Sequence, residues 1–523
     1  MKSAFRGLSV VAFLVIQVAS SAASDRPNVL FILADDMGWQ DTSAEFGPER
    51  TSYNDRYHTP ALERLAEEGM KFTQAYACAV CSPTRVSLFT GQNEARHRVT
   101  QWTFRSGEQP SSDLTHPSLA AANWNWNGLQ PSDVTIPNSV NAATLPALLK
   151  QSGYHTMHFG KGHLGAADTA GADPKVFGFD VRIGGRDAGG CGSYYAAENF
   201  GAKKSPNGPW RAWDLDSYFG QDIHLTEALT REATREIRDA VQRDQPFFCY
   251  FAHFAPHTPI APDERFAPNF RRQGLDDIEA AYASLIEGMD KSVGDLLALL
   301  DELGIADNTL VVFTSDNGGL SHDRRSMAPP HTHNRPLSSG KGSHHEGGIR
   351  VPLLVRWPSV VQPKTTCQTP VIIYDWFPTL SGVGQATPVP HLDGLSLIPL
   401  LKNQSPPDDF DRPLIWHFPN FWGPLKRPPV EGPGMGPSST IRRGDWKLIY
   451  YHTDLRFELF NLADDLGETR NLSTKHPRIL AGLAGELGEY LRSSNAVMPI
   501  VKMTGRPVPW PDQVEQPING DAR

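Results

Sequence analysis

The chain has 523 residues, of which 39% are hydrophobic and 20% are charged, and its formal net charge is -9 at pH 7. This is the balance of an ordinary globular enzyme, and the length allows one large domain and a smaller one. Because phosphate binding needs clustered positive charge, the acidic balance and the lack of a Lys/Arg-rich run argue against nucleic acid as a main partner.

Residues 1–24 have the pattern of a secretory signal peptide. Lys2 and Arg6 give a positive start, residues 8–18 are almost wholly apolar, and the small residues at 19–23 offer a cleavage site. The apolar run is shorter than the roughly 20 residues that span a bilayer, and no later stretch has a transmembrane pattern. We therefore expect an exported protein, periplasmic or extracellular, without a membrane span.

From residue 28 the chain alternates strand patterns with helical ones. The strand patterns, most of them continuous apolar runs, lie at 28–34, 72–76, 154–159, 246–252 and 309–314. Helical patterns lie at 59–66, 84–90, 145–151, 225–243 and 280–303. This order predicts an α/β fold with a large, mostly parallel sheet sandwiched by helices.

Residues 92–141 lack periodicity and are rich in Ser, Asn, Pro and Trp, with Trp102, Trp124 and Trp126 among them. They form either a surface loop that packs its own aromatic side chains or a platform on which sugar rings stack.

The pattern of predicted elements changes after about residue 410. Short strand patterns at 414–418, 439–442, 446–451 and 457–460 precede a helical one at 479–492. They predict a small antiparallel sheet covered by a helix. The chain is thus divided into a signal peptide (1–24), a large catalytic domain (25–410) and a C-terminal subdomain (411–523).

Acidic residues follow two of the predicted strands. Asp35 and Asp36 end the first, and Asp316 and Asn317 end another. In open α/β sheets ligands bind at the carboxyl ends of the strands, and hard oxygen ligands without His or Cys favour Ca²⁺ or Mg²⁺ over zinc. The alternative is that these side chains only cap helices and hold turns.

Cys81 begins the segment Cys-Ser-Pro-Thr-Arg, and Cys78 lies three residues before it. A C-x-x-C pair suits redox chemistry or half a zinc site. No second C-x-x-C is present, however, and neither alternative gives residues 83–85 a role. A buried, inert cysteine is the remaining structural alternative.

Basic residues in glycine-rich turns complete the candidate site. Lys161 and Lys341 could bind an anionic group and offset developing charge, and His163 and His257 could act as base and acid. His344 and His345 are further candidate substrate contacts in the loop after Lys341.

These blocks, in this order, resemble the formylglycine-dependent sulfatases of the alkaline phosphatase superfamily. The matching segments are 35–36, 81–85 with 90–91, 160–163, 256–257, 316–319, and 341 with 346–348. They cover residues 27 to 355, and the segments 444–448 and 458–462 are similar to the small domain of the family.

The resemblance implies an alkaline-phosphatase-like fold and a calcium ion held by the acidic cluster and residue 81. It implies that a formylglycine-generating enzyme oxidises Cys81 to an aldehyde whose hydrate attacks sulfur, supported by Arg85. After the alcohol leaves, a base, His163 by position, would help to expel sulfate and restore the aldehyde. Lys161, His257 and Lys341 match the sulfate-binding and proton-transfer residues. One departure is Thr84, where many members have serine.

Three functions stay open. The first is hydrolysis of a sulfate ester, and a signal peptide with a tryptophan-rich insertion suits a sulfated sugar better than a small aryl sulfate. The second is hydrolysis of a phosphate or phosphonate ester by the same superfamily. The third is an exported glycan-binding protein whose site has lost activity. Against this third function, every position that matches a catalytic residue of the family carries a residue competent for that role.

Overall fold

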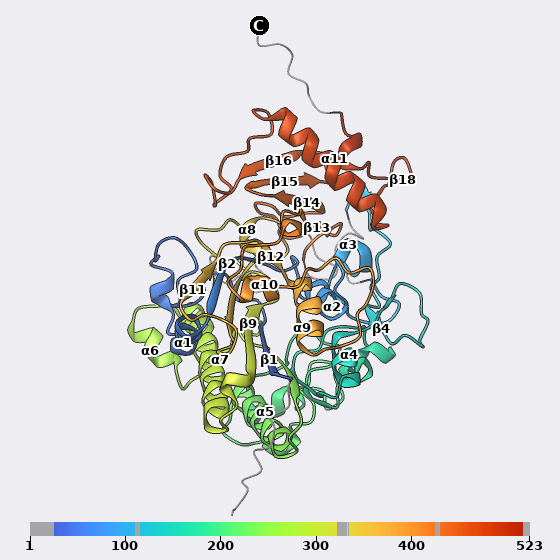
Figure 1. Ribbon diagram of the computed structural model, residues 1–523. Helices are drawn as coiled ribbons and strands as arrows, with labels where there is room; N and C mark the ends of the chain where they lie inside the picture. Colours follow the sequence, from blue (N-terminus) through green and yellow to red (C-terminus); the bar gives the residue numbers. More distant parts are fainter. Residues whose placement is uncertain (1–25, 110–115, 322–331, 333, 424–428, 516–523) are drawn as a thin grey trace, which may run out of the picture.

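The computed structural model describes residues 26–109, 116–321, 332, 334–423 and 429–515, so the predicted signal peptide lies outside the described residues. A large sheet between helices forms one part, and a smaller sheet covered by one helix lies at its end (Figure 1). None of the helices in the described ranges is long and apolar enough to cross a membrane.

Nine strands form the large sheet, in the order β11-β2-β10-β9-β1-β8-β6-β7, with β12 beside β2. All pairs in it are parallel except those of β10, which runs antiparallel to β2 and β9. The bounds are β1 Asn28–Ala34, β2 Met70–Tyr76, β6 His155–Gly160, β7 Val181–Gly184, β8 Phe247–Ala252, β9 Thr309–Ser315, β10 Arg350–Arg356, β11 Thr365–Cys367 and β12 Val371–Ile372.

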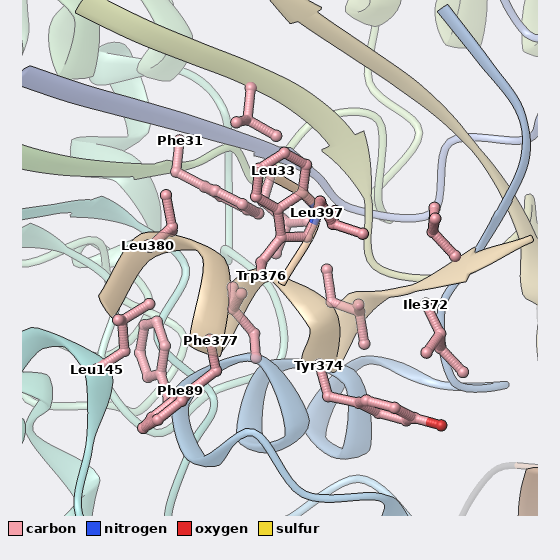
Figure 2. Packing of buried hydrophobic residues seen from close by; sticks show 14 of the residues in the cluster. Phe31, Leu33, Phe89, Leu145, Ile372, Tyr374, Trp376, Phe377, Leu380 and Leu397 are labelled. Carbon is pink, nitrogen blue, oxygen red and sulfur yellow. The ribbon is translucent and has the colours of Figure 1, made fainter. Parts of the chain in front are cut away.

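Helices cover both faces of this sheet, because the side chains of a strand alternate between its faces. From β1, Phe31 and Leu33 pack with α2, α4 and α9 on one face, as Figure 2 shows for Trp376 and Phe377. Leu30 and Ile32 pack with α1, α5 and α7 on the other face. The bounds are α1 Pro60–Glu68, α2 Cys81–Thr90, α4 Leu145–Gln151, α5 Leu225–Gln242, α7 Asp277–Glu302 and α9 Trp376–Val383.

The smaller sheet has the antiparallel order β13-β14-β15-β16, and α11 lies across it (Figure 1). Its bounds are β13 Leu414–Phe418, β14 Ser438–Arg443, β15 Trp446–Tyr451, β16 Phe457–Asn461 and α11 Pro477–Ser493. The predicted fold class, a mostly parallel sheet between helices with a small antiparallel sheet, is therefore confirmed.

The sequence pattern did not predict β10, because Pro352 and the arginines at both ends of the strand interrupt its apolar run. It also left the insertion at 92–141 undivided. In the structure β3 of that insertion pairs with β17, and Trp124 is fully buried in the main core. The short elements are α3 Glu94–His97, β3 Leu119–Ala120, β4 Leu129–Gln130, β5 Val140–Asn141, α6 Ala267–Arg272, α8 Glu346–Ile349, α10 Ile398–Leu401, β17 Ile500–Val501 and β18 Arg506–Pro507.

Candidate active site

The carboxyl ends of four parallel strands and the start of α2 meet in one buried cluster. Asp35 and Asp36 follow β1, Lys161 and His163 follow β6, His257 follows β8, and Asp316 and Asn317 follow β9. Cys81 is the first residue of α2, and Lys341 comes from the loop before α8. Ten of the twelve predicted site residues are therefore brought together here: Asp35, Asp36, Cys81, Arg85, Lys161, His163, His257, Asp316, Asn317 and Lys341.

Cys81 faces a histidine whose protonation is set by its other neighbour. The Sγ of Cys81 lies 3.3 Å from Nδ1 of His163, and Nε2 of His163 lies 3.0 Å from the carbonyl oxygen of Thr103. Because a carbonyl only accepts, Nε2 carries the hydrogen and Nδ1 presents a lone pair to residue 81. Burial, together with the charge of Lys161, lowers the pKa of His163 well below its usual range. The imidazole is therefore neutral and can accept a proton.

Arg85 and Thr84 tie the start of α2 to the loop after β9. The guanidinium of Arg85 donates to Oδ2 of Asp316 from Nη2 at 2.8 Å and from Nε at 3.1 Å. Its Nη1 donates to the carbonyl oxygen of Lys161 at 3.1 Å. The hydroxyl of Thr84 donates to the main-chain oxygen of Asp316 at 2.6 Å. A fixed, fully buried cation thus stands one turn from residue 81.

Two buried lysines face the two aspartates that follow β1. Nζ of Lys161 lies 2.7 and 2.8 Å from the carboxylate oxygens of Asp35, and Nζ of Lys341 lies 2.5 Å from Oδ1 of Asp36. Burial raises the pKa of Asp35 well above its usual value, although Lys161 opposes that shift. Burial also acts to raise the pKa of Asp36, but the charges of Lys341, His257 and Lys161 together outweigh it and hold this pKa below its usual value.

Oxygen atoms in this cluster still lack partners, which suits a hard cation. Within the described residues, Oδ2 of Asp36 and Oδ1 of Asn317 are buried without a hydrogen-bond partner. Ligand atoms of Asp35, Asp36 and His257 lie within 4.8 Å of one another. Buried carboxylate and amide oxygens without partners are the donors that Ca²⁺ and Mg²⁺ prefer, so the residues present fit such an ion.

Asp36 itself has a φ of 68°, a left-handed conformation that an aspartate adopts at some cost. This backbone turn follows β1 directly, where Nδ2 of Asn317 donates to Oδ1 of Asp36 at 2.8 Å. We infer that this strained backbone conformation directs the carboxylates of Asp35 and Asp36, which are adjacent in sequence, into the same cluster.

His344 and His345 are not among these residues. Nδ1 of His344 lies 3.0 Å from the hydroxyls of Ser438 and Thr440 on β14. The ring of His345 lies between the hydroxyl of Ser338 and the carboxylate of Glu458, at 3.0 and 3.1 Å. The structure therefore places both rings against the small sheet, outside the buried cluster.

Residues that sequence analysis did not single out also line the site. A Cβ added to Gly189 would lie 2.6 Å from Cε1 of His163, and one added to Gly190 would lie 3.0 Å from Nδ1 of His257. Only a segment without side chains can therefore approach both imidazoles this closely. The pair of adjacent glycines is the feature of the sequence that could have indicated this contact. The residues around the pair have no helix or strand periodicity, so the sequence does not show that the pair lies beside the site.

The sequence matches the Sulfatase family over residues 27–386, and the C-terminal region of N-sulphoglucosamine sulphohydrolase over residues 340–492. A sulfatase from Formosa agariphila is 31% identical, with 97% of this chain and 96% of that protein covered. Mouse N-acetylgalactosamine-6-sulfatase is 30% identical, with coverages of 87% and 83%.

Solved structures show the same fold. Ps i-CgsB in complex with k-i-k-neocarrahexaose aligns with a TM-score of 0.69 and 27% identity, over 89% of this chain and 93% of that one. The phosphonate monoester hydrolase of Agrobacterium radiobacter aligns with a TM-score of 0.58 and 20% identity, over 91% of this chain and 100% of that one. The chain belongs to the sulfatase family, with the alkaline-phosphatase-like fold that its sequence motifs imply. It is a sulfuric ester hydrolase.

Proposed function

We propose that this protein is an exported sulfatase that removes an O-sulfate group from a carbohydrate. The proposal includes maturation of Cys81 to formylglycine by a formylglycine-generating enzyme, and a calcium ion, with Mg²⁺ as the alternative. The observation that carries it is the position of residue 81, whose side chain faces the neutral His163 at 3.3 Å and stands beside the buried ionic cluster.

Residue 81 would supply the nucleophile. In the mature protein a hydrated aldehyde at this position provides an oxygen nucleophile, which a thiol does not. The chain's own residues then have separate tasks. Nδ1 of His163 accepts a proton from the side chain at residue 81, because Nε2 is committed to the carbonyl of Thr103. Arg85 keeps a fixed positive charge beside the reacting group and does not lose its proton at any working pH.

The calcium ion would be held by Asp35, Asp36, Asp316 and Asn317 with residue 81. Such an ion would supply positive charge next to the sulfate oxygens and favour the ionised form of the nucleophile. Lys161 and Lys341 are paired with Asp35 and Asp36 in this structure, and they would be free to bind the sulfate group if a bound cation neutralised those carboxylates. His257 donates from Nδ1 to the carbonyl of Thr258 at 2.8 Å and presents Nε2 towards Asp36, and this nitrogen would have to take up a proton before it could protonate the leaving alcohol.

A carbohydrate substrate is supported by the names of similar proteins. The mouse relative is an N-acetylgalactosamine-6-sulfatase, and the structure of Ps i-CgsB was determined in complex with k-i-k-neocarrahexaose. Both cover more than four fifths of this chain. The likeness to the phosphonate monoester hydrolase is at the level of fold alone, so it adds no support for phosphonate chemistry.

Release of inorganic sulfate from sulfated sugars tests this function. Protein coexpressed with a formylglycine-generating enzyme should release sulfate from N-acetylgalactosamine 6-sulfate or from a carrageenan oligosaccharide. The Cys81→Ala variant should release none and keep the same circular dichroism spectrum. Cleavage of phosphonate monoesters but not of any sulfated sugar would contradict the proposal, and so would full activity of the Cys81→Ala variant.

A further inference from the structure

A wall of aromatic side chains leads from the buried site to the protein surface. It consists of Trp422, Trp102, Phe104 and Trp210, and we call it the aromatic wall. At its inner end the Nζ of Lys341 lies 5.5 Å from the ring centroid of Trp422. Trp102 packs into the same apolar cluster as Trp422 and as Val80, the residue before Cys81.

The rest of the wall follows ring to ring. The centroids of Trp102 and Phe104 lie 5.7 Å apart, and those of Phe104 and Trp210 lie 6.3 Å apart. Trp102 and Phe104 are half-buried, whereas 43% of Trp210 is exposed. Among the residues that the structure describes, Trp210 is the only exposed tryptophan, although the chain contains twelve. The indole of Trp210 thus ends the row at the protein surface, where an aromatic ring can stack on a ligand.

The backbone fixes one side of this wall directly beside the reacting residues. Thr103, between Trp102 and Phe104, accepts a hydrogen bond from His163 through its carbonyl oxygen at 3.0 Å. Its own N–H donates to the hydroxyl of Ser82 at 3.1 Å. The carbonyl of Phe104 in turn accepts from the N–H of Ala167 at 2.8 Å. The rings at positions 102 and 104 are therefore held next to the site by the same contacts that orient His163.

The other side of the wall is anchored through the glycine segment that covers the imidazoles. The N–H of Gly192 donates to the carbonyl of Trp210 at 2.6 Å, and Gly189 and Gly190 lie against His163 and His257. The backbone of Trp210 is thus hydrogen-bonded to Gly192, two residues after Gly190 in the segment that contacts both imidazoles.

Positive charge stands at the outer end of the wall. The guanidinium carbon of Arg105 lies 5.4 Å from the ring centroid of Phe104, and the side chain is exposed. Within the described part of the chain Arg105 forms no salt bridge, although Asp187 lies in the field of both Arg105 and Arg186. A cation held flat on an aromatic ring keeps its hydrogen-bond donors available to an anion.

We propose that the aromatic wall, with Arg105 at its rim, binds the sugar unit adjacent to the one that loses its sulfate, and that this adjacent unit carries an anionic group of its own. The inference rests on the proposed carbohydrate sulfatase function and adds the substrate class: a polyanionic oligosaccharide rather than a sulfated monosaccharide. The apolar face of the adjacent sugar stacks on Phe104 and Trp210, while its sulfate or carboxylate meets Arg105.

The test compares a long and a short substrate in the mature, full-length protein. The variants are Trp210→Ala and Arg105→Ala. Met503→Ala replaces another exposed apolar side chain, and Arg456→Ala replaces an arginine that lies over Tyr451 of the small sheet, so these two are the controls. The long substrates are k-i-k-neocarrahexaose and a hexasaccharide that contains N-acetylgalactosamine 6-sulfate, and N-acetylgalactosamine 6-sulfate itself is the short one.

We expect Trp210→Ala to lower kcat/KM for the preferred hexasaccharide by about tenfold, mainly through KM, because one stacking contact is lost. The Arg105→Ala variant should show a similar loss that shrinks as the salt concentration rises. Both variants should turn over the monosaccharide as the wild type does. The two control variants should match the wild type on every substrate.

Unchanged hexasaccharide kinetics in both variants would overturn the inference and leave the sulfatase function standing. Equal losses on the long and the short substrate would also overturn it, because the effect would then lie in the reacting site. If the wild-type protein released sulfate from none of these substrates, the proposed function itself would fail. That result is seen in the wild type alone, so it is distinct from a failure of the inference, which is seen in the variants.

Discussion

The hydroxyl of Thr84 donates a hydrogen bond of 2.6 Å to the main-chain oxygen of Asp316, across 232 positions of sequence. The same hydroxyl accepts from the N–H of Cys78 at 3.0 Å. One side chain thus joins the start of α2 to the loop after β9, and both segments contribute to the active site. Threonine supplies the hydroxyl that serine would supply, and its methyl group is accommodated in a fully buried position.

The Thr84→Val variant should therefore be less stable by roughly 1–3 kcal/mol, because it leaves a buried N–H and a buried carbonyl without their partner. The Thr84→Ser variant keeps the hydroxyl and is the matched control, with a loss below that of Thr84→Val. Urea unfolding measures the stability of both variants. The protein is made without the maturation enzyme, so that conversion of Cys81 does not affect the comparison. Equal stability of the wild type and Thr84→Val would show that the bridge is not needed.

Calcium should stabilise this protein by binding at the cluster after β1 and β9. An ion that binds only the folded state at a hundred times its Kd adds about 2.7 kcal/mol, which raises Tm. The Asp36→Asn variant should lose this rise, since it removes a carboxylate whose Oδ2 is buried without a partner. The Asp290→Asn variant should keep the rise in Tm. Asp290 lies in α7, and its buried carboxylate accepts hydrogen bonds from the N–H groups of Ala61 and Leu62 at the start of α1. A calcium-dependent Tm that survives in Asp36→Asn would place the ion elsewhere.

His253 should make the protein sensitive to acid. Its ring is fully buried, both ring nitrogens lack partners among the described residues, and burial lowers its pKa to about 3. The unfolded chain takes up a proton near pH 6.5 but the folded chain does not, so this contribution to stability falls as the pH drops from 6.5 towards 3.

Between pH 7 and pH 5 the His253→Leu variant should accordingly lose about 2 kcal/mol less stability than the wild type. Denaturant unfolding at the two pH values measures the difference. His58→Leu serves as a control, because the side chain of His58 is 67% exposed. Parallel pH profiles for the wild type and His253→Leu would contradict the expectation.

The loop that carries Lys341 is held by a buried ionic group in the small sheet. Nζ of Lys447 lies 2.9 Å from Glu346, at the start of α8, and 2.8 Å from Glu468. The Lys447→Met variant leaves two buried carboxylates without their cation and should cost roughly 3–5 kcal/mol. Adding Glu468→Gln should restore part of that loss, since Glu346 keeps Arg350 as a partner. No recovery in the double variant would show that the charge is not the cause.

Much of the site could be predicted because its residues follow recognisable strands. The apolar runs before Asp35, Lys161, His257 and Asp316 identify parallel strands, and parallel strands bring their ends to one edge of the sheet. A local pattern of this kind predicts where a residue lies in the fold. Because these four strand ends meet at one edge of the sheet, it also predicts that the residues after them are neighbours in space.

Other features depend on contacts that no local pattern records. His344 and His345 lie in the expected loop, but hydroxyls and a carboxylate of the small sheet bind their rings. Trp124 sits in a segment without periodicity and is nonetheless a core residue. The approach of Gly189 to His163 and the exposure of Trp210 follow from an irregular segment whose path is set by tertiary contacts.

The state of residue 81 tests the central claim most directly. The tryptic peptide 72–85 from protein made with a formylglycine-generating enzyme can be weighed by mass spectrometry and treated with a hydrazine. We predict loss of the thiol mass and gain of a carbonyl that reacts with the hydrazine, in step with the release of sulfate. An intact cysteine in a preparation that still releases sulfate from the sugar would contradict the account.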